Sequence, residues 1–383
     1  MFFAEVVFWL SIIGVGYAYV GYPLMLLTYG FFCRPVQRTW NQTFLPTISI
    51  VMAAYNEVST IRRKVENCLA LDYPREKLQL LIGSDGSDDG TNDILQEYSN
   101  QEVEFLAFHP RCGKMKTINR LVERSRGEIC VFSDITELFD PDALQKLVRH
   151  FVDSEIGLVG GNHVFNETTS GLGAGNSLFR KFKTVLWGVE SRVYSICTCD
   201  GPIYACRREL FPFPPEDTIN DDVAVPLGIL SRGKRIVFDS EAIVRGDVLH
   251  ETRLFFRQKI RMHAGMYQNF EQFPCLFWPW PLRRWWIFVS HCVLPTLVPW
   301  LMVFALVTNG SLWFSGQGPY QVLMILQVCF YLVAAVGYLF ERYGIHIRLT
   351  AIPFYFVTAN LGVLCGCFAY VLGIQRVTWR KIE

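Results

Sequence analysis

Four long apolar stretches most constrain how this chain of 383 residues folds. None of them contains Asp, Glu, Lys or Arg, and a helix needs about 20 apolar residues to cross a bilayer. A buried hydrophobic hairpin is the alternative, but four stretches of spanning length are difficult to hide in a soluble core. We therefore expect a membrane protein. The stretches are Phe8–Phe32, Trp286–Val307, Tyr320–Phe340 and Thr350–Ile374.

The charges that flank these stretches predict an orientation. Arg34 and Arg38 follow the first stretch, and basic residues favour the cytoplasmic side. We expect residues 1–33 to be an anchor, 45–270 a cytoplasmic domain, 273–285 an interfacial segment rich in Trp and Pro, 286–374 a region of about three spans, and 375–383 a basic tail.

The basic tail conflicts with this topology. Three spans after a cytoplasmic domain place the C-terminus outside, whereas Arg376, Arg380 and Lys381 favour the inside. One of the last three stretches would then be re-entrant, and Pro295 and Pro299 make the first of them the best candidate.

The first half of the polar domain alternates short apolar strands with helical patterns, which predicts an α/β fold with a mostly parallel sheet. Further along, Leu178, Phe182 and Val185 recur at helical spacing, and we interpret this stripe as core in preference to a membrane-facing surface. The expected strands are 47–53, 78–83, 103–107, 129–133 and 156–160, and the expected helices are 58–71, 92–98, 114–123 and 141–151.

Charge and cysteine usage exclude some classes of protein. The net charge of +1 provides no general field for nucleic acid. The twelve cysteines are scattered without paired zinc spacing, so we expect reduced, packed thiols.

Polar side chains follow three of the expected strands. The segment Ser84–Thr91 reads SDGSDDGT, an earlier strand ends in Tyr55-Asn56-Glu57, and a third ends in Ser133-Asp134. Open α/β sheets bind ligands at the carboxyl ends of their strands, so these residues predict a nucleotide site. Asp85 can accept hydrogen bonds from a nucleobase, although an Asp in a tight turn commonly satisfies local backbone donors instead.

Two further segments suit phosphate chemistry. Gly113 and Lys114 enter a helix, which makes either an anion site or a solvated basic turn. Asp134 closes a buried strand and suits a hard divalent cation, with the substrate's phosphates supplying the other ligands.

The last candidates lie before the apolar C-terminal region. Asp221 and Asp222 precede an apolar helix, where one carboxylate can act as a general base or cap the helix. Gln258 and Arg261 lie in the segment QKIRM, where the guanidinium can pair with a leaving diphosphate or with lipid headgroups.

Taken in order, these motifs resemble the membrane-bound family 2 glycosyltransferases, which include synthases of hyaluronan, chitin, cellulose and poly-N-acetylglucosamine. The resemblance covers about residues 45–270. It rests on Tyr55-Asn56-Glu57, SDGSDDGT, RCGK, FSDITELFDPDAL, DGPIYACRRELF, NDDVAVPL and QKIRM.

The resemblance implies a GT-A fold, a nucleotide-diphosphate sugar donor (most often a UDP-sugar), Mg²⁺ or Mn²⁺, and inversion at the anomeric carbon. It implies that Asp222 is the base, with Asp221, Gln258 and Arg261 beside the reacting groups, and that Asp134 binds the metal. Substrate-binding residues by the same resemblance are Tyr55, Glu57, Asp85, Lys114, Asp134 and Asp200.

Three departures from the family pattern bear on metal binding, on the base and on processivity: Asp221-Asp222 stands where Glu-Asp is usual, and the other two concern the metal and the acceptor, respectively. Thr136 stands where a second acid is usual, and Met262 replaces the tryptophan that ends the motif of processive synthases. The acceptor is a growing polysaccharide or a lipid-linked glycan. The alternatives are single-sugar transfer to a polyprenyl phosphate, and a non-catalytic scaffold or export subunit. We expect the plasma (inner) membrane as the location, and four spans would need a homo-oligomer or an export partner to secrete a polymer.

Overall fold

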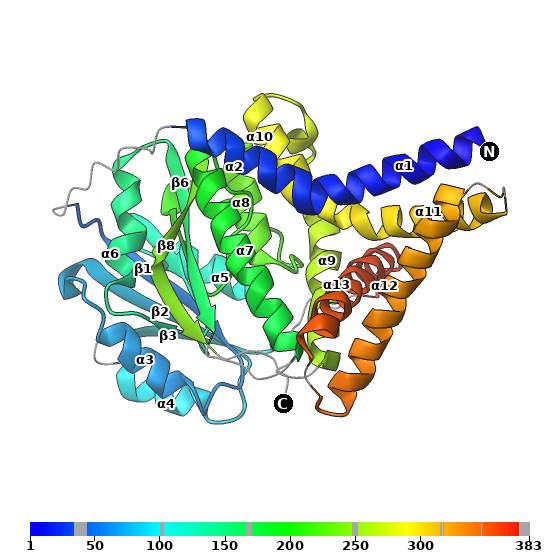
Figure 1. Cartoon of the computed structure of the whole chain (residues 1–383). Coiled ribbons are helices and arrows are strands. Elements are labelled where there is room, and N and C mark those ends of the chain that lie inside the picture. The colour runs from blue at the N-terminus through cyan, green and yellow to red at the C-terminus, as the bar shows by residue number, and fades with distance from the viewer. Residues whose placement is uncertain are drawn as a thin grey trace.

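An eight-stranded mixed sheet organises the polar part of the chain (Figure 1). The computed structural model describes residues 1–33, 44–99, 103–165, 171–246, 252–314, 316, 318–345 and 347–374. The strand order is β3-β2-β1-β4-β7-β6-β8-β5. The strands are β1 (Ile48–Ala54), β2 (Leu78–Asp85), β3 (Val103–Phe108), β4 (Ile129–Phe132), β5 (Leu138–Phe139), β6 (Ile156–Phe165), β7 (Tyr204–Arg207) and β8 (Arg235–Gly246).

The first half of the sheet is parallel and the second half is mixed. β1 pairs in parallel with β2 and β4, and β2 pairs in parallel with β3, so that their carboxyl ends meet at one edge. β7 is antiparallel to both β4 and β6, and β5 is antiparallel to β8. The parallel part therefore provides the edge at which an α/β ligand site is expected.

Helices cover both faces of the sheet because the strand side chains alternate between them. Ile48, Ile50 and Met52 of β1 point into a core with the helices of one face, and Val51 points into a core on the other face. The first face packs against α3 (Ile61–Leu69), α4 (Thr91–Tyr98) and α6 (Ala143–Val148), and the second against α5 (Lys114–Arg124), α7 (Gly171–Val193) and α8 (Asp221–Ser231).

The elements predicted from the first half of the domain are all present, with small shifts at their ends. β5, β7, β8 and α9 (Thr252–Gln272) were not predicted. β5 and β7 have two and four residues, too few to display a period. They find their partners across long stretches of chain, which local patterns do not encode.

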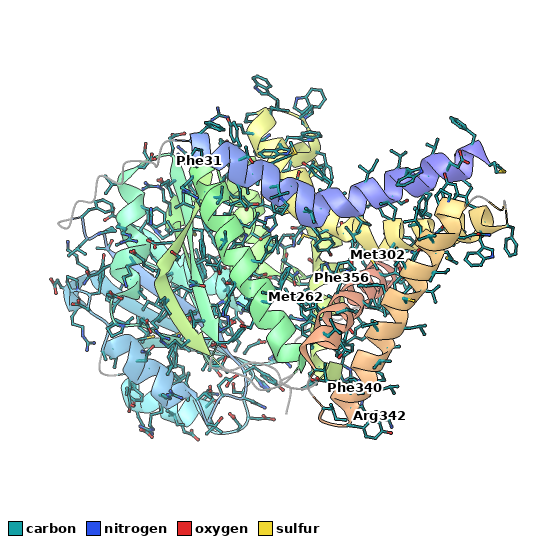
Figure 2. The ribbon with its side chains drawn as sticks, in the orientation of Figure 1. Phe31, Met262, Met302, Phe340, Arg342 and Phe356 are labelled. Atoms are coloured by element: carbon teal, nitrogen blue, oxygen red, sulfur yellow. The ribbon has the colours of Figure 1, made fainter. Side chains whose placement is uncertain are left out.

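Four helical segments are long and apolar enough to cross a membrane, in agreement with the sequence. The first combines α1 (Phe2–Gly16) with α2 (Tyr22–Phe32), the second combines α10 (Leu282–Ile287) with α11 (Leu294–Trp313), and the others are α12 (Gly318–Arg342) and α13 (Arg348–Val371). Figure 2 shows that the sticks projecting from α1 and α12 are mostly carbon, whereas many around the sheet end in nitrogen or oxygen. A bilayer would cover this apolar surface, and the segments indicate a membrane protein.

The stripe on α7 differs from the core that we expected. Leu178, Phe182 and Val185 are exposed, and only Leu186 and Val189 are buried. The helix packs against α2 and α13, so it lies beside the apolar helices and not wholly inside the sheet domain (Figure 1). The exposed part of the stripe therefore forms an apolar surface beside the candidate spans.

Candidate active site

Asp85 organises the loop that leads into α5. The carboxylate is fully buried at the end of β2. Its Oδ1 accepts hydrogen bonds from the backbone N–H of Cys112 (2.6 Å) and of Gly113 (3.1 Å), and Oδ2 accepts one from Arg111 Nε (3.3 Å). Gly113 has φ +99°, which a side chain would strain. The acid therefore fixes the start of α5, while its contact with a nucleobase stays a prediction.

Tyr55 and Glu57 both follow β1, but their side chains contact different segments of the chain. The Arg111 guanidinium lies 3.5 Å from the centre of the Tyr55 ring, so Tyr55 joins the loop that Asp85 holds. Glu57 accepts a hydrogen bond from the Thr60 hydroxyl (2.6 Å), and its backbone N–H donates to Thr91 Oγ1 (2.9 Å). Glu57 thus connects the turns before α3 and α4, and its predicted contact with substrate is not visible in these bonds.

Lys114 joins two carboxylates from distant parts of the chain. Its Nζ lies 3.0 Å from Asp134 Oδ1, after β4, and 3.1 Å from Asp221 Oδ1, at the start of α8. Partial burial favours the neutral amine, but these two carboxylates raise the pKa of Lys114 above its usual value. Burial also works against the charge of Asp134, and Lys114 nevertheless lowers the pKa of that carboxyl. The three groups form a charged bridge across the predicted edge.

Asp222 is the residue after Asp221 of this bridge, and its raised pKa suits a general base. Burial first, and then the neighbouring charge of Asp221, raise the pKa of Asp222 to about 7, while Lys114 and Arg261 oppose the rise. A carboxyl with that pKa is poised to accept a proton near neutral pH. The expectation that one of the two acids caps the helix is wrong, because Asn220 is the N-cap residue and Asp221 is the first residue of α8.

Asp200 adds a third acid beside Asp222. The Lys183 ammonium lies 2.7 Å from Asp200 Oδ1, and Arg180 lies 3.6 Å from Oδ2. Burial would raise the pKa of Asp200, but these two cations lower it to about 2. A Cβ at Gly201 would lie 3.5 Å from the Cβ of Asp222, so the Asp200 segment borders the base directly.

The two predicted residues of α9 differ in position. Arg261 is half-buried and close enough to Asp222 to act on its pKa. Gln258 is exposed, and no described hydrogen bond ties it to the acids of the site. The structure therefore brings together Asp85, Lys114, Asp134, Asp200, Asp221, Asp222 and Arg261 around one edge of the sheet.

The chain supplies few ligands for a divalent metal. In the described ranges, no group of three or more His, Cys, Asp or Glu side chains could hold a metal ion. The half-buried Asp134 offers one hard oxygen donor, and Thr136, at the position of the missing second acid, donates to Glu137 (3.2 Å). This donor set fits a Mg²⁺- or Mn²⁺-type ion only when the substrate's phosphates provide most of the ligands.

Several site residues were missed by the sequence analysis. Arg111 was quoted only as part of a motif, Arg180 was not noted, and Lys259 was passed over between Gln258 and Arg261. Arg180 and Lys183 are three residues apart on α7, which places them on one face of the helix. That spacing could have identified Arg180 and Lys183 as a pair from the sequence. Lys259 reaches them only through the packing of α9, which the sequence alone does not predict.

Comparison with known proteins shows a match to one family in the sheet domain. Residues 49–211 match the model of glycosyl transferase family 2. This part of the chain is therefore similar to family 2 glycosyltransferase domains, in agreement with the resemblance of its motifs.

Two curated relatives are similar over more than half of the chain. The "Probable glycosyltransferase YdaM" of Bacillus subtilis (strain 168) is 24% identical over 241 residues, which cover 59% of this chain and 56% of that protein. The poly-beta-1,6-N-acetyl-D-glucosamine synthase of Staphylococcus aureus (strain COL) is 24% identical over 249 residues, covering 62% of this chain and 60% of that protein. The match thus spans less than two thirds of either relative.

A solved structure shares the fold over almost the whole chain. The mannosyltransferase PcManGT from Pyrobaculum calidifontis, solved with GDP-Man and Mn²⁺, superposes with a TM-score of 0.75 at 20% identity, covering 97% of this chain and 100% of that one. This likeness confirms the predicted GT-A-type sheet domain flanked by membrane helices.

Proposed function

We propose that the protein is a membrane-integral, inverting glycosyltransferase that moves a sugar from a nucleotide-diphosphate sugar to a hydroxyl of a glycan or lipid-linked acceptor. The observation that carries this proposal is the Lys114 bridge between Asp134 and Asp221, with Asp222 beside it. The bridge places a phosphate-binding cation next to a carboxyl whose pKa suits a general base.

The reaction would be a direct displacement. Asp222 takes the proton of the acceptor hydroxyl, whose oxygen bonds to the anomeric carbon as the bond to the β-phosphate oxygen breaks. Lys114 and Arg261 bind the departing nucleoside diphosphate, because cations near the leaving oxygens stabilise the charge that develops there. A divalent ion held by Asp134 and the donor's phosphates would add to this stabilisation.

The donor and the orientation are proposed from separate observations. The structural neighbour was solved with GDP-Man and Mn²⁺, and a curated relative makes a polymer of N-acetylglucosamine. We therefore propose a UDP- or GDP-sugar as donor. We also propose that the sheet domain faces the cytoplasm at the plasma (inner) membrane, with the exposed Trp278 and Trp280 in the headgroup region.

The test is donor turnover by the purified, full-length protein. It would be incubated with a panel of UDP- and GDP-sugars plus Mg²⁺ or Mn²⁺, and release of nucleoside diphosphate would be measured. We expect release with one donor and its loss in Asp222→Asn, while Asp142→Asn, which changes an exposed acid paired with Lys146, retains it. Equal release by wild type and Asp222→Asn would contradict the role of Asp222, and no release with any donor or lipid would favour a scaffold.

A further inference from the structure

Three cations converge beside the base without enough acids to balance them. Arg180 and Lys183 of α7 both pair with Asp200. Lys259 of α9 faces the rings of Phe179 and Phe255, with its Nζ 5.9 and 5.2 Å from their centres. Within the described ranges, no carboxylate lies within ion-pair distance of Lys259. We call Arg180, Lys183 and Lys259 the cation cluster.

The cluster is electrostatically uncompensated. Burial, together with the charges of Lys183 and Arg180, lowers the pKa of Lys259 to about 8. One carboxylate, Asp200, offsets three cations, which leaves an excess of positive charge in a half-buried place. Desolvated charges of one sign are unfavourable unless a counter-charge binds. An anionic ligand would supply that counter-charge.

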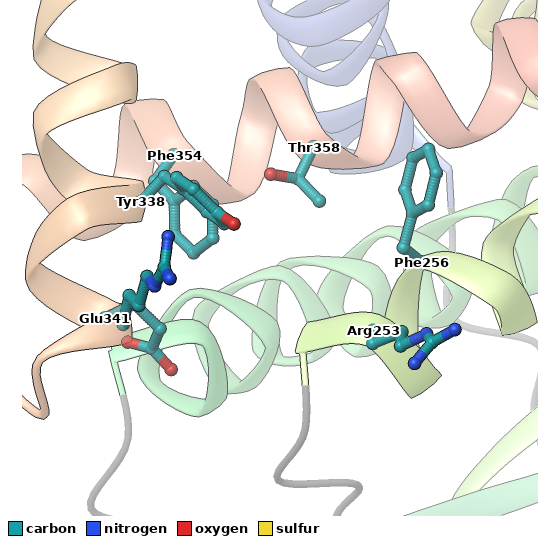
Figure 3. A pocket seen from close by; sticks show the side chains of 7 residues that line it. Arg253, Phe256, Tyr338, Glu341, Phe354 and Thr358 are labelled. Atoms are coloured by element: carbon teal, nitrogen blue, oxygen red, sulfur yellow. The ribbon is translucent and has the colours of Figure 1, made fainter.

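A cavity adjoins the cluster on the side of the membrane helices. Its volume is about 500 Å³ and it lies between α9, α12 and α13. In Figure 3, Tyr338 and Glu341 come from the end of α12, Phe354 and Thr358 from α13, and Arg253 and Phe256 from α9. Arg342, the last residue of α12, also lines it. Aromatic walls, with Glu341 and Arg342 at the end of the candidate span α12 and Arg253 at the start of α9, suit the boundary between lipid and water.

The cavity and Lys259 lie on neighbouring turns of α9, both beside α13. Phe256 lines the cavity, and Lys259 lies three residues further along the same helix face. A Cβ at Gly362 of α13 would meet Lys259 Cβ at 2.7 Å and Phe256 Cδ2 at 3.7 Å. α13 therefore packs directly on the turn of α9 that carries Phe256 and Lys259, and the Asp200 segment connects the cluster to Asp222.

We propose that the acceptor is a saccharide joined through a phosphate to a lipid, that the cation cluster binds this phosphate, and that the cavity admits the lipid from the membrane. The inference rests on the proposed function, because it places the phosphate beside the base of that reaction. An acceptor made only of uncharged sugars would leave the cluster unbalanced.

The presence of the base indicates what attacks the donor. A phosphate is already ionised at neutral pH and needs no base, whereas a sugar hydroxyl does. The hydroxyl of the lipid-linked sugar therefore forms the new bond to the anomeric carbon and gives its proton to Asp222. The donor's bond to the β-phosphate breaks, and the acceptor's own phosphate is unchanged and serves only to bind.

Binding of farnesyl diphosphate tests this assignment without knowledge of either sugar. The full-length protein in phosphatidylcholine nanodiscs would be titrated with farnesyl diphosphate, with farnesol, and with inorganic diphosphate. In one titration EDTA would exclude metal-bridged binding at Asp134, and in a parallel titration with Mg²⁺ saturating UDP and GDP would occupy the donor site. We expect farnesyl diphosphate to bind at least about ten-fold more tightly than either of the other probes.

Variants locate the binding. Lys259→Met and Lys183→Met should each weaken farnesyl diphosphate binding about ten-fold or more. Arg257→Met and Lys181→Met, which change exposed cations on the same two helices, should leave it unchanged. Because Lys259 faces two rings and no acid, Lys259→Met should keep or raise the melting temperature, which separates a binding role from a folding role.

The outcomes distinguish this inference from the proposed function. Three results would overturn the inference. Farnesyl diphosphate could bind no better than farnesol or inorganic diphosphate, or UDP or GDP could displace it. It could also bind equally well to the wild type, Lys259→Met and Lys183→Met. Donor turnover by the same protein preparations, assayed with Mg²⁺ or Mn²⁺ and without EDTA or added UDP and GDP, reports on the proposed function separately. Turnover that depends on Asp222 without specific lipid-phosphate binding would contradict only the acceptor site.

Discussion

The ammonium of Lys114 lies 3.1 Å from Oδ1 of Asp221, which ties the start of α5 to the start of α8. The same ammonium contacts Asp134 at the end of β4. Three elements of the site thus share one cation, and any ligand phosphate that binds Lys114 would also approach both acids. This sharing makes the position of Lys114 unusually sensitive to substitution.

Replacement of Lys114 should impair catalysis more than it impairs folding. Lys114→Met leaves Asp134 and Asp221 without their shared cation, so we expect kcat/KM to fall by about a hundred-fold or more. Lys116→Met is the matched control, because Lys116 is on the same helix and pairs with the exposed Glu216. Steady-state kinetics with the active donor would check this, and similar losses in both variants would argue against the special role of Lys114.

The rate should depend on pH through Asp222. Its pKa is raised to about 7, so the carboxyl is protonated and inactive as a base below that pH. We expect kcat/KM to fall about ten-fold per pH unit below 7. Because Lys114 lowers the pKa of Asp222, Lys114→Met should move this limb to higher pH. A limb that stays near pH 4, or that does not move, would assign the titration to another group.

Donor binding should require a divalent ion held by Asp134. We expect EDTA to weaken binding of the nucleotide sugar, added Mn²⁺ or Mg²⁺ to restore it, and Asp134→Asn to prevent the restoration. Asp140→Asn is a suitable control, since Asp140 forms an ion pair with the half-exposed Arg245. Isothermal titration would measure the affinities. Affinity that survives both the chelator and Asp134→Asn would show that the metal assignment is wrong.

The sequence predicted the parallel half of the sheet because its strands and helices follow one another locally. It also placed Asp85, Lys114, Asp134 and Asp222 at the correct strand and helix ends. The periodicity of those segments and the edge rule for parallel strands are enough for this result.

The cation cluster could not be predicted in the same way. Lys259 and Lys183 lie on different helices, and only the packing of α9 and α7 against α13 brings them together. For Asp85, the sequence indicated a polar strand end. The backbone N–H groups that donate to its carboxylate belong to Cys112 and Gly113, which are 27 and 28 residues further along the chain. Apolar pattern alone likewise could not show that Leu178 and Val185 of α7 are exposed, because core and membrane surfaces have the same composition.

The packing of α5 on β2 should tolerate no side chain at Gly83. A Cβ there would lie 2.3 Å from Thr117 Cγ2 and 3.2 Å from Leu121 Cδ1. Gly83→Ala should therefore push α5 outward and destabilise the fold by about 1–3 kcal/mol. Gly188→Ala is the control, because nothing lies within 4 Å of its Cβ position in α7. Removal of a helical glycine should be neutral or stabilising by up to about 1 kcal/mol. Thermal unfolding would compare them, and equal melting temperatures would contradict the tight contact.

Asp222 should lower the stability of the ligand-free protein at neutral pH. Its pKa rises from 3.8 in the unfolded chain to about 7 in the fold, so folding favours the protonated carboxyl. That stabilisation is complete below pH 3.8 and is lost as the pH rises through 7. We therefore expect Asp222→Asn to exceed the wild type at pH 8 by about 1–3 kcal/mol in the free energy of unfolding, and the difference to shrink as the pH falls. Thermal unfolding in EDTA at several pH values would measure it. A variant less stable than the wild type at pH 8 would show that Asp222 is held as a stabilised anion, which would remove the basis for its role as a base near neutral pH.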